Sequence, residues 1–287
     1  MFALVGCGPA LNPSQPVPLA QYGTWHQTPF GTSDLHFVSA GNPDKPLVIF
    51  IHGTPGSWSA FRAFLSNPRL QTEVHMLALD RPGFGRSANL GPSPEFAQQA
   101  QAVAQLFHQN TTNRRILIVG HSLGGSISYR VALDYPDEIG GVLAISSAID
   151  PDLSKPRWYN YAANFPLVDW FLPDDLSTSN EEMMPLAIEL KKMANTLQKI
   201  KVPVTIVQGA KDGLVNEKNL NFARSQLVNA ELNILHFPER GHFIIWEEHE
   251  MMVDEILRMA KNLEPFATGV VGQNKPKNTI QKMGAAE

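Results

Sequence analysis

The sequence predicts an α/β fold in which a mostly parallel, doubly wound sheet is covered by helices on both faces. Short apolar runs recur along the chain, and such runs are typical of strands that are buried on both faces of a parallel sheet. Helical stretches separate these runs, which is the pattern of successive βαβ units. The composition agrees, because 287 residues with 43% hydrophobic and 17% charged side chains can bury a large core.

The expected strands and helices alternate along the chain. Strand-like sequence begins at Thr24 and continues at Leu35–Ser39, Leu47–Ile51, Val74–Leu79, Ile116–Val119, Val142–Ser146, Val204–Gln208 and Leu232–His236. The expected helices are Phe96–His108, Ile127–Tyr135, Phe222–Leu227 and Met251–Leu263. Pro136 ends the second helix, since proline lacks the backbone N–H that a helix interior uses.

The interval 150–201 contains no convincing strand and predicts an inserted helical lid. Two helical pieces fit it, Pro156–Leu172 and Glu181–Ile200, and Ser179 with Glu182 three residues later is typical of a capping box at the start of the second. The first piece is rich in aromatic side chains, namely Trp158, Tyr159, Tyr161, Phe165, Trp170 and Phe171. We expect most of these rings to fix the lid to the body and some to line an apolar underside.

The expected domain limits follow from these elements. A segment rich in Pro, Gly, Asn and Ser predicts a flexible linker at residues 1–23, and a polar segment predicts a flexible tail at residues 264–287. Residues 24–149 and 202–263 form the core. Residues 150–201, which we call the lid, are inserted into it.

The composition excludes several classes of partner and site. The formal net charge is −4, whereas binding to nucleic acid calls for a strongly basic face. The longest apolar runs are far shorter than the ~20 residues of a transmembrane helix. A single cysteine excludes an internal disulfide and a cysteine-based zinc cluster, and the nine histidines form no H-x-x-x-H or HExxH pattern. We therefore expect no metal site.

The segment Leu4-Val5-Gly6-Cys7 resembles the lipobox of bacterial lipoproteins, in which the cysteine is lipid-modified after a signal peptide is cleaved. Only six residues precede Cys7, without a basic and apolar leader. Two interpretations stay open. Cys7 is a membrane anchor and the protein belongs to the bacterial cell envelope, or the segment is an ordinary linker in a cytoplasmic protein.

A Gly-x-Ser-x-Gly motif at residues 120–124 lies between the expected strand Ile116–Val119 and a helix. In this context the motif is typical of a nucleophile elbow, in which the serine occupies a strained turn above the edge of the sheet. Gly120 and Gly124 lack side chains, so neighbouring segments can approach closely. The N-terminus of the following helix favours developing negative charge. The motif predicts Ser122 as a nucleophile.

A nucleophilic serine needs a base that accepts its proton and an acid that orients the base, and in this architecture they follow in the order serine, acid, histidine. Asp212 and His242 each come directly after an expected strand, where sites in open α/β sheets lie. Asp150 also follows a strand and is the rival acid, although we favour Asp212. His236 and His249 fall within a strand and a helix, so we expect both to be structural.

An oxyanion hole needs two backbone N–H groups that point at the reacting centre. The residue after the nucleophile, Leu123, is expected to supply one of them. The loop His52–Ser57 follows an earlier strand and is expected to supply the other. Because Pro55 has no N–H, Thr54 is the expected second donor. We expect His52 to shape this loop rather than to act as an acid or base.

Together these motifs resemble the α/β-hydrolase superfamily. They are His-Gly-Thr-Pro-Gly-Ser at 52–57, Asp-Arg-Pro-Gly-Phe-Gly-Arg-Ser at 80–87, Gly-His-Ser-Leu-Gly-Gly at 120–125, Asp212, and Gly241-His242. The resemblance covers residues 24–263 and implies a mostly parallel eight-stranded sheet, a lid after the sixth strand and no cofactor. Epoxide hydrolases and haloalkane dehalogenases of this superfamily carry aspartate as nucleophile. Ser122 therefore implies the serine-nucleophile branch and acyl chemistry.

The expected function is hydrolysis of an acyl bond, most readily a carboxylic ester of a small to medium apolar substrate, through an acyl-enzyme on Ser122. Candidate contacts to this small-molecule substrate are Trp158, Tyr161, Phe165 and Phe243. Three alternatives stay open: an acyltransferase or a carbon–carbon bond hydrolase on the same triad, or a binding protein without catalysis. The natural substrate and the oligomeric state are not indicated by the sequence.

Overall fold

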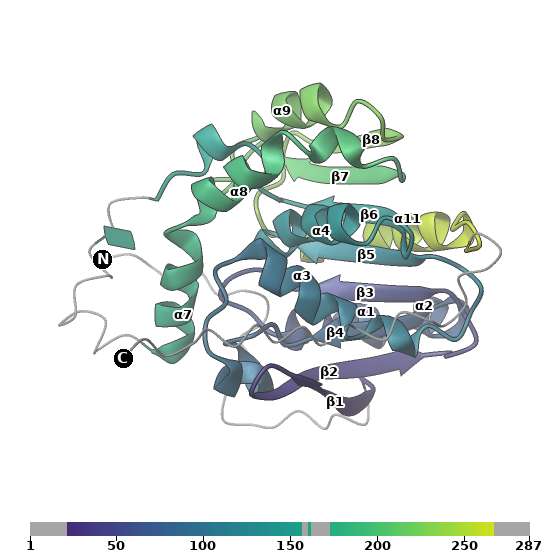
Figure 1. Cartoon of the computed structure of the whole chain (residues 1–287). Coiled ribbons are helices and arrows are strands. Elements are labelled where there is room, and N and C mark those ends of the chain that lie inside the picture. The colour runs from purple at the N-terminus through teal and green to yellow at the C-terminus, as the bar shows by residue number, and fades with distance from the viewer. Residues whose placement is uncertain (1–21, 157–159, 162–172, 267–287) are drawn as a thin grey trace.

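The computed structural model describes residues 22–156, 160–161 and 173–266, and these form an eight-stranded sheet with helices on both faces (Figure 1). The strands are β1 (Thr24–Phe30), β2 (Ser33–Gly41), β3 (Leu47–Ile51), β4 (His75–Leu79), β5 (Ile116–His121), β6 (Ile139–Ile145), β7 (Val204–Gly209) and β8 (Leu232–Phe237). Their order across the sheet is β1-β2-β4-β3-β5-β6-β7-β8. β2 pairs antiparallel with β1 and β4, and the other neighbours pair in parallel, which confirms the predicted α/β fold.

The two faces of the sheet carry separate cores. Along β3, Leu47, Ile49 and Ile51 point into one core, while Val48 and Phe50 point into the other. This alternation explains why the strand is apolar at every position, since each side chain of a centrally placed parallel strand is buried. Each such fully buried side chain contributes about 1.5–3 kcal/mol to folding.

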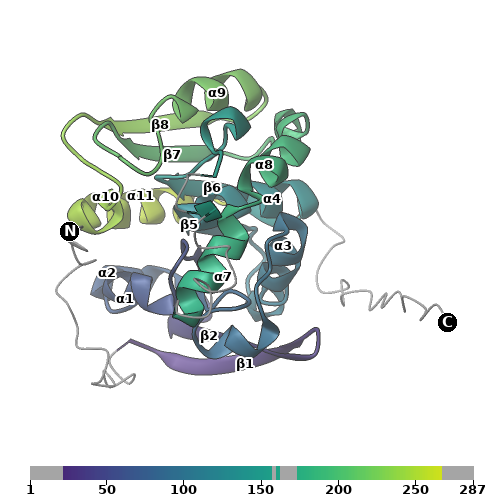
Figure 2. The same ribbon diagram turned by 90° about the vertical axis from the view of Figure 1, so that its left-hand side faces the viewer.

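Helices cover both cores, as Figure 2 shows with the sheet between them. The first core is covered by α3 (Phe96–Ala104), α4 (Leu123–Asp134), α8 (Leu186–Ala194) and α9 (Asn219–Gln226). The second core is covered by α1 (Arg62–Leu65), α2 (Pro68–Glu73), α10 (Ile244–Glu247) and α11 (His249–Lys261). Short 3-10 turns complete the connections at η2 (Trp58–Phe61), η3 (Gly85–Leu90), η4 (Phe107–Gln109), η5 (Pro151–Leu153) and η6 (Leu197–Lys199).

The lid differs from its prediction. The helix expected as one piece over Glu181–Ile200 consists of α7 (Asp174–Met183), α8 and a 3-10 turn. Pro185 separates α7 from α8, because proline cannot donate within a helix. The proposed capping box is wrong, since Ser179 lies inside α7 and is buried. The other expected lid helix, Pro156–Leu172, lies largely outside the described residues.

The core extends slightly beyond both of its expected limits, residues 24 and 263. The ring of Tyr22 lies 6.2 Å from that of Trp58, so the body begins before residue 24. Glu264 accepts a hydrogen bond from Arg115 N–H at 2.9 Å, and Phe266 N–H donates to Asn113 at 3.1 Å. Residues 264–266 are therefore fixed, whereas we expected the flexible tail to begin there. The segment with Cys7 and the remainder of the tail lie outside the described residues.

The part of the chain that the structure describes has no helix of the length and apolarity needed to cross a bilayer.

Candidate active site

Ser122 occupies the turn between β5 and α4 in a conformation that non-glycine residues rarely adopt. Its φ is 55° and its ψ is −124°. A positive φ in a non-glycine residue is strained and persists only where the surroundings enforce it. Here the Ser122 N–H donates to the Ile145 carbonyl of the neighbouring strand β6 at 2.8 Å. The serine is thus held at the carboxyl ends of the central parallel strands.

Two glycines allow α4 to begin against the sheet at this point. A Cβ on Gly124 would lie 2.1 Å from the Ile51 carbonyl oxygen of β3, and one on Gly120 would lie 2.3 Å from the Gly124 oxygen. Any other side chain would therefore force the elbow apart. The helix was expected to begin only at Ile127, because glycine has a low helix propensity and hides its first turn. It begins at Leu123, so its N-terminal N–H groups open directly at Ser122.

Asp212 and His242 form a hydrogen-bonded pair beyond the ends of β7 and β8. His242 Nδ1 lies 2.9 Å from Asp212 Oδ2, and both side chains are buried. The other carboxylate oxygen, Oδ1, accepts hydrogen bonds from the N–H groups of Leu214 (2.9 Å) and Val215 (2.8 Å). Burial opposes ionisation of Asp212, but the His242 hydrogen bond and charge and these two N–H groups outweigh it and hold the pKa of Asp212 below its ordinary value.

His121 connects this pair to the elbow. Its Nε2–H donates to the His242 carbonyl at 3.0 Å, and the two imidazole rings lie 5.0 Å apart. Because His121 directly precedes Ser122, the loop of His242 is fastened to the strand that ends at the serine. Burial lowers the pKa of His121 to about 3, so this residue is neutral near pH 7.

The alternative candidates for the acid and the base have structural roles elsewhere. Asp150 accepts a hydrogen bond from the Asp152 N–H at 2.9 Å and caps the turn η5. His236 lies in β8 and pairs with Glu217 on the surface at 2.8 Å. His249 begins α11, and its ring lies 4.5 Å from that of Phe64. Of the candidate acids, the structure brings Asp212 to His242.

The loop after β3 lies against the serine. A Cβ built on Gly53 would be 2.9 Å from Ser122 Cβ, so this glycine is in close approach to the elbow. Thr54 follows it, and the Thr54 N–H has no hydrogen-bond acceptor in the described part of the chain. Leu123, the other predicted donor, is the first residue of α4 and is 5% exposed. Leu123 thus follows Ser122 directly in sequence, and Thr54 follows the glycine that packs against the serine.

His52 is fully buried and makes two hydrogen bonds. Its Nδ1–H donates to the Gly53 carbonyl at 2.7 Å, and its Nε2 accepts from the Arg81 N–H at 3.0 Å. Burial and the nearby Arg81 charge hold the pKa of His52 well below its ordinary value. With both nitrogens engaged and the ring neutral, His52 shapes the loop, as the sequence predicted.

Three residues near the site have roles that the sequence analysis did not assign. Gln208, at the end of β7, is fully buried and donates to Asp212 Oδ2 at 3.2 Å. Arg81 is also fully buried and forms an ion pair with Glu182 of the lid. Sequence pattern alone could not have found them, because a glutamine in an apolar strand and an arginine in a glycine-rich loop give no sign of their partners.

The predicted substrate contacts are only partly described. Tyr161 is 54% exposed. The Phe243 ring lies 5.6 Å from that of His242 and is half-buried. Trp158 and Phe165 lie outside the described residues.

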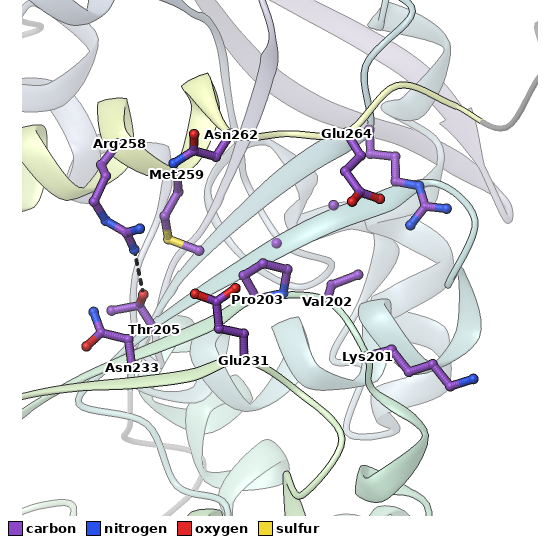
Figure 3. Close-up of a pocket in the computed structure, with 13 residues that line it drawn as sticks. Lys201, Val202, Pro203, Thr205, Glu231, Asn233, Arg258, Met259, Asn262 and Glu264 are labelled. Atoms are coloured by element: carbon purple, nitrogen blue, oxygen red, sulfur yellow. Dashed lines mark hydrogen bonds between the residues drawn. The ribbon is translucent and has the colours of Figure 1, made fainter.

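A pocket of about 410 Å³ lies at the opposite edge of the sheet, where β6, β7 and β8 begin (Figure 3). Side chains of both charge signs line it, and Arg258 lies next to Thr205. This mixed lining does not indicate one class of ligand. No group of three or more histidine, cysteine or acidic side chains that could hold a metal ion occurs among the described residues.

Comparison with known proteins agrees with this fold. The family model for the α/β hydrolase fold matches residues 46–176. The AB hydrolase superfamily protein YfhM of Bacillus subtilis is 26% identical over 150 residues, which cover 47% of this chain and 50% of that protein. A 2-hydroxy-6-oxononadienedioate/2-hydroxy-6-oxononatrienedioate hydrolase of Pseudomonas sp. is 31% identical over 108 residues, covering 37% of this chain and 38% of that protein. The chain thus spans half or less of these two relatives.

Solved structures share the fold over a greater length. A membrane phospholipase A superposes with a TM-score of 0.60 at 20% identity, covering 84% of this chain and 88% of that one. A 2-hydroxy-6-oxo-6-phenylhexa-2,4-dienoate hydrolase from Rhodococcus sp. strain RHA1 superposes with a TM-score of 0.63 at 19% identity, covering 83% of this chain and 98% of that one. The chain therefore has the α/β-hydrolase fold. Within it, the residue at the nucleophile elbow is a serine, Ser122.

Proposed function

We propose that the protein is a serine hydrolase that cleaves a carboxylic ester of a small to medium apolar substrate. The observation that carries this proposal is the hydrogen-bonded pair of Asp212 and His242 at the edge of the sheet where Ser122 stands in its strained turn. A serine hydroxyl is a weak nucleophile until a base accepts its proton, and an oriented histidine is such a base.

The reaction follows from these positions. Ser122 Oγ attacks the acyl carbon while His242 Nε2 accepts the hydroxyl proton, and Asp212 keeps the other imidazole nitrogen protonated and oriented. The N–H groups of Thr54 and Leu123 stabilise the oxyanion. His242 then protonates the leaving alcohol as the tetrahedral intermediate collapses to an acyl-enzyme. Water repeats the sequence, releases the acid and restores the Ser122 hydroxyl.

Exposed apolar side chains support an apolar acyl group. Tyr161 and Leu176 belong to the lid, and Leu214 follows Asp212 in the loop after β7. Each is more than 40% exposed, although large apolar side chains are usually buried. An apolar acyl chain at this edge would remove part of this surface from water, which favours binding.

The Pseudomonas relative favours a second candidate, a carbon–carbon bond hydrolase that uses the same three residues. The two candidates differ in the bond that breaks. A 2-hydroxy-6-oxodienoate tested beside nitrophenyl esters separates them, because an esterase would turn over the esters faster.

The first experiment is labelling of the wild type and of Ser122→Ala with a fluorophosphonate probe. An activated serine is labelled, and the label is lost in the variant. Nitrophenyl esters of increasing chain length then measure the size of the acyl site, and Ser122→Ala should lose on the order of 10⁶ in turnover, as in another serine hydrolase. Absence of labelling in a folded wild type would reject the proposal and favour a binding protein.

A matched pair of variants tests the acid. Asp212→Asn should lower kcat about 10⁴-fold, because the amide holds the wrong tautomer of His242. Asp150→Asn should retain activity, because asparagine is also a good cap for the short turn that Asp150 begins. The reverse result would show that Asp150 is the acid.

A further inference from the structure

The peptide group between Gly53 and Thr54 is held by its carbonyl oxygen. His52 Nδ1–H donates to this oxygen at 2.7 Å, and Arg81 Nη2 donates to it at 2.8 Å. A peptide group is planar, with its C=O and N–H pointing in opposite directions. Two donors that fix the Gly53 oxygen therefore also fix the direction of the Thr54 N–H, the proposed oxyanion donor.

Arg81 is in turn held by the lid. Its Nη1 and Nη2 lie 2.5 Å and 3.0 Å from the two carboxylate oxygens of Glu182 in α7, and its Nε donates to the His52 carbonyl at 3.0 Å. The Arg81 side chain is 0% exposed and that of Glu182 2%. Such paired, two-bond contacts of arginine with carboxylate are directional as well as strong. Figure 2 shows α7 crossing over the carboxyl ends of the parallel strands.

Glu182 has a further neighbour that fixes its position. Gln99 Nε2 of α3 donates to Glu182 Oε1 at 2.8 Å. In addition, a Cβ on Gly83, in the loop after Arg81, would lie 2.8 Å from Thr178 of α7. The loop that carries Arg81 and the helix that carries Glu182 thus pack tightly on each other.

We propose that Glu182 is a positioning residue that acts through Arg81 to orient the Thr54 N–H, so that α7 must be docked for the oxyanion site to be complete. This inference rests on the proposed function for its chemical consequence. It connects two events in one ion pair: the docking of α7 and the assembly of the oxyanion site. An undocked α7 leaves a buried guanidinium without its carboxylate, so that one of the two donors to the Gly53 oxygen is no longer held in place.

The chain offers a matched control in Glu189. This carboxylate also lies in the lid and is buried, at 5% exposed, and it accepts a hydrogen bond from the Phe96 N–H of α3 at 3.0 Å. It pairs with Lys192 on the same helix. Within the described part of the chain its partners are Phe96 and Lys192 and not the loop 52–54, so Glu189 connects the lid to the body without touching the oxyanion peptide.

The test compares Glu182→Gln with Glu189→Gln in two assays. In protein labelled with ¹⁵N-threonine, the Thr54 amide resonance should shift or broaden in Glu182→Gln and stay in place in Glu189→Gln. With a nitrophenyl ester, Glu182→Gln should lower kcat about 10- to 100-fold at unchanged KM, a part of the ~10²–10³ that loss of a whole oxyanion donor costs. The affinity for a trifluoromethyl ketone, which forms a tetrahedral adduct on the serine, should fall by the same factor.

Two outcomes would overturn the inference: an unmoved Thr54 resonance in Glu182→Gln, or equal effects of the two variants in both assays. Glu182→Asp keeps the charge and shortens the side chain, and it should show a smaller shift and a smaller loss of kcat. It takes the place of Glu182→Gln if that variant does not fold. Failure of the wild type to react with a fluorophosphonate would reject the proposed function, while the Thr54 resonance would still decide whether Glu182 orients the peptide.

Discussion

Replacement of Gly53 by alanine is expected to push the loop and Ser122 apart and to lower activity. The added Cβ would lie 2.9 Å from Ser122 Cβ and 3.3 Å from the His121 carbonyl oxygen. Carbon atoms in contact lie about 3.5–4.0 Å apart, so the loop and the serine must separate by about 0.6–1.1 Å. A misplacement of about 1 Å can cost about 10²-fold in rate. We therefore expect kcat/KM to fall about 100-fold, which corresponds to about 2.7 kcal/mol of transition-state stabilisation.

Initial rates with a nitrophenyl ester and the rate of phosphonylation measure this loss. Unfolding in urea measures the accompanying strain, which for overpacking is about 1–3 kcal/mol. Gly213→Ala is the control, because a Cβ there meets no atom within 4 Å although the residue directly follows Asp212. It should retain both activity and stability. Wild-type rates in Gly53→Ala would refute the reasoning, since the loop could then not lie against the serine.

Two further predictions concern buried polar groups behind the site. Gln208→Leu removes the amide that donates to Asp212 Oδ2. Because a hydrogen bond to a charged group contributes about 1.5–3 kcal/mol, kcat should fall at least about tenfold at unchanged KM. An unchanged kcat would show that this contact does not support the acid. The folded-state pKa of His121, about 3, lies below its ordinary 6.5, so the unfolded chain binds more protons between these values and stability must fall as the pH falls below 6.5. From pH 7.5 to pH 5.5 this residue alone should lower the free energy of unfolding by on the order of 1 kcal/mol. Urea unfolding at both pH values should show a smaller decrease in His121→Gln, and an equal decrease would contradict the assignment.

The sequence predicts the central part of the fold because the same residues carry the local pattern and the tertiary role. In β3, every position is apolar because both faces of the strand are buried, so the run itself identifies the strand. The geometry of Asp212 and His242 is likewise foreseeable, since each follows a strand of the same parallel sheet and must arrive at the same edge.

The lid is harder to predict, because its structure depends on partners that are distant in sequence. Ser179 and Glu182 have the spacing of a capping box, but the helix begins five residues earlier, after Pro173. Glu182 instead reaches Arg81, 101 residues away along the chain. No local pattern indicates such a pairing, and this is why the sequence predicts no role at the oxyanion site for Arg81 or Glu182.

The strained turn at Ser122 has a consequence for how the protein can be stabilised. At a φ of 55° and a ψ of −124°, a side chain costs about 1–3 kcal/mol that glycine would not incur. Glycine in turn loses about 0.5–1 kcal/mol more on folding than a residue with a side chain. Ser122→Gly should therefore be more stable than the wild type and should lack activity. Selection for thermal stability alone would favour loss of the nucleophile. A screen for more thermostable variants of this protein must therefore measure turnover as well as folding.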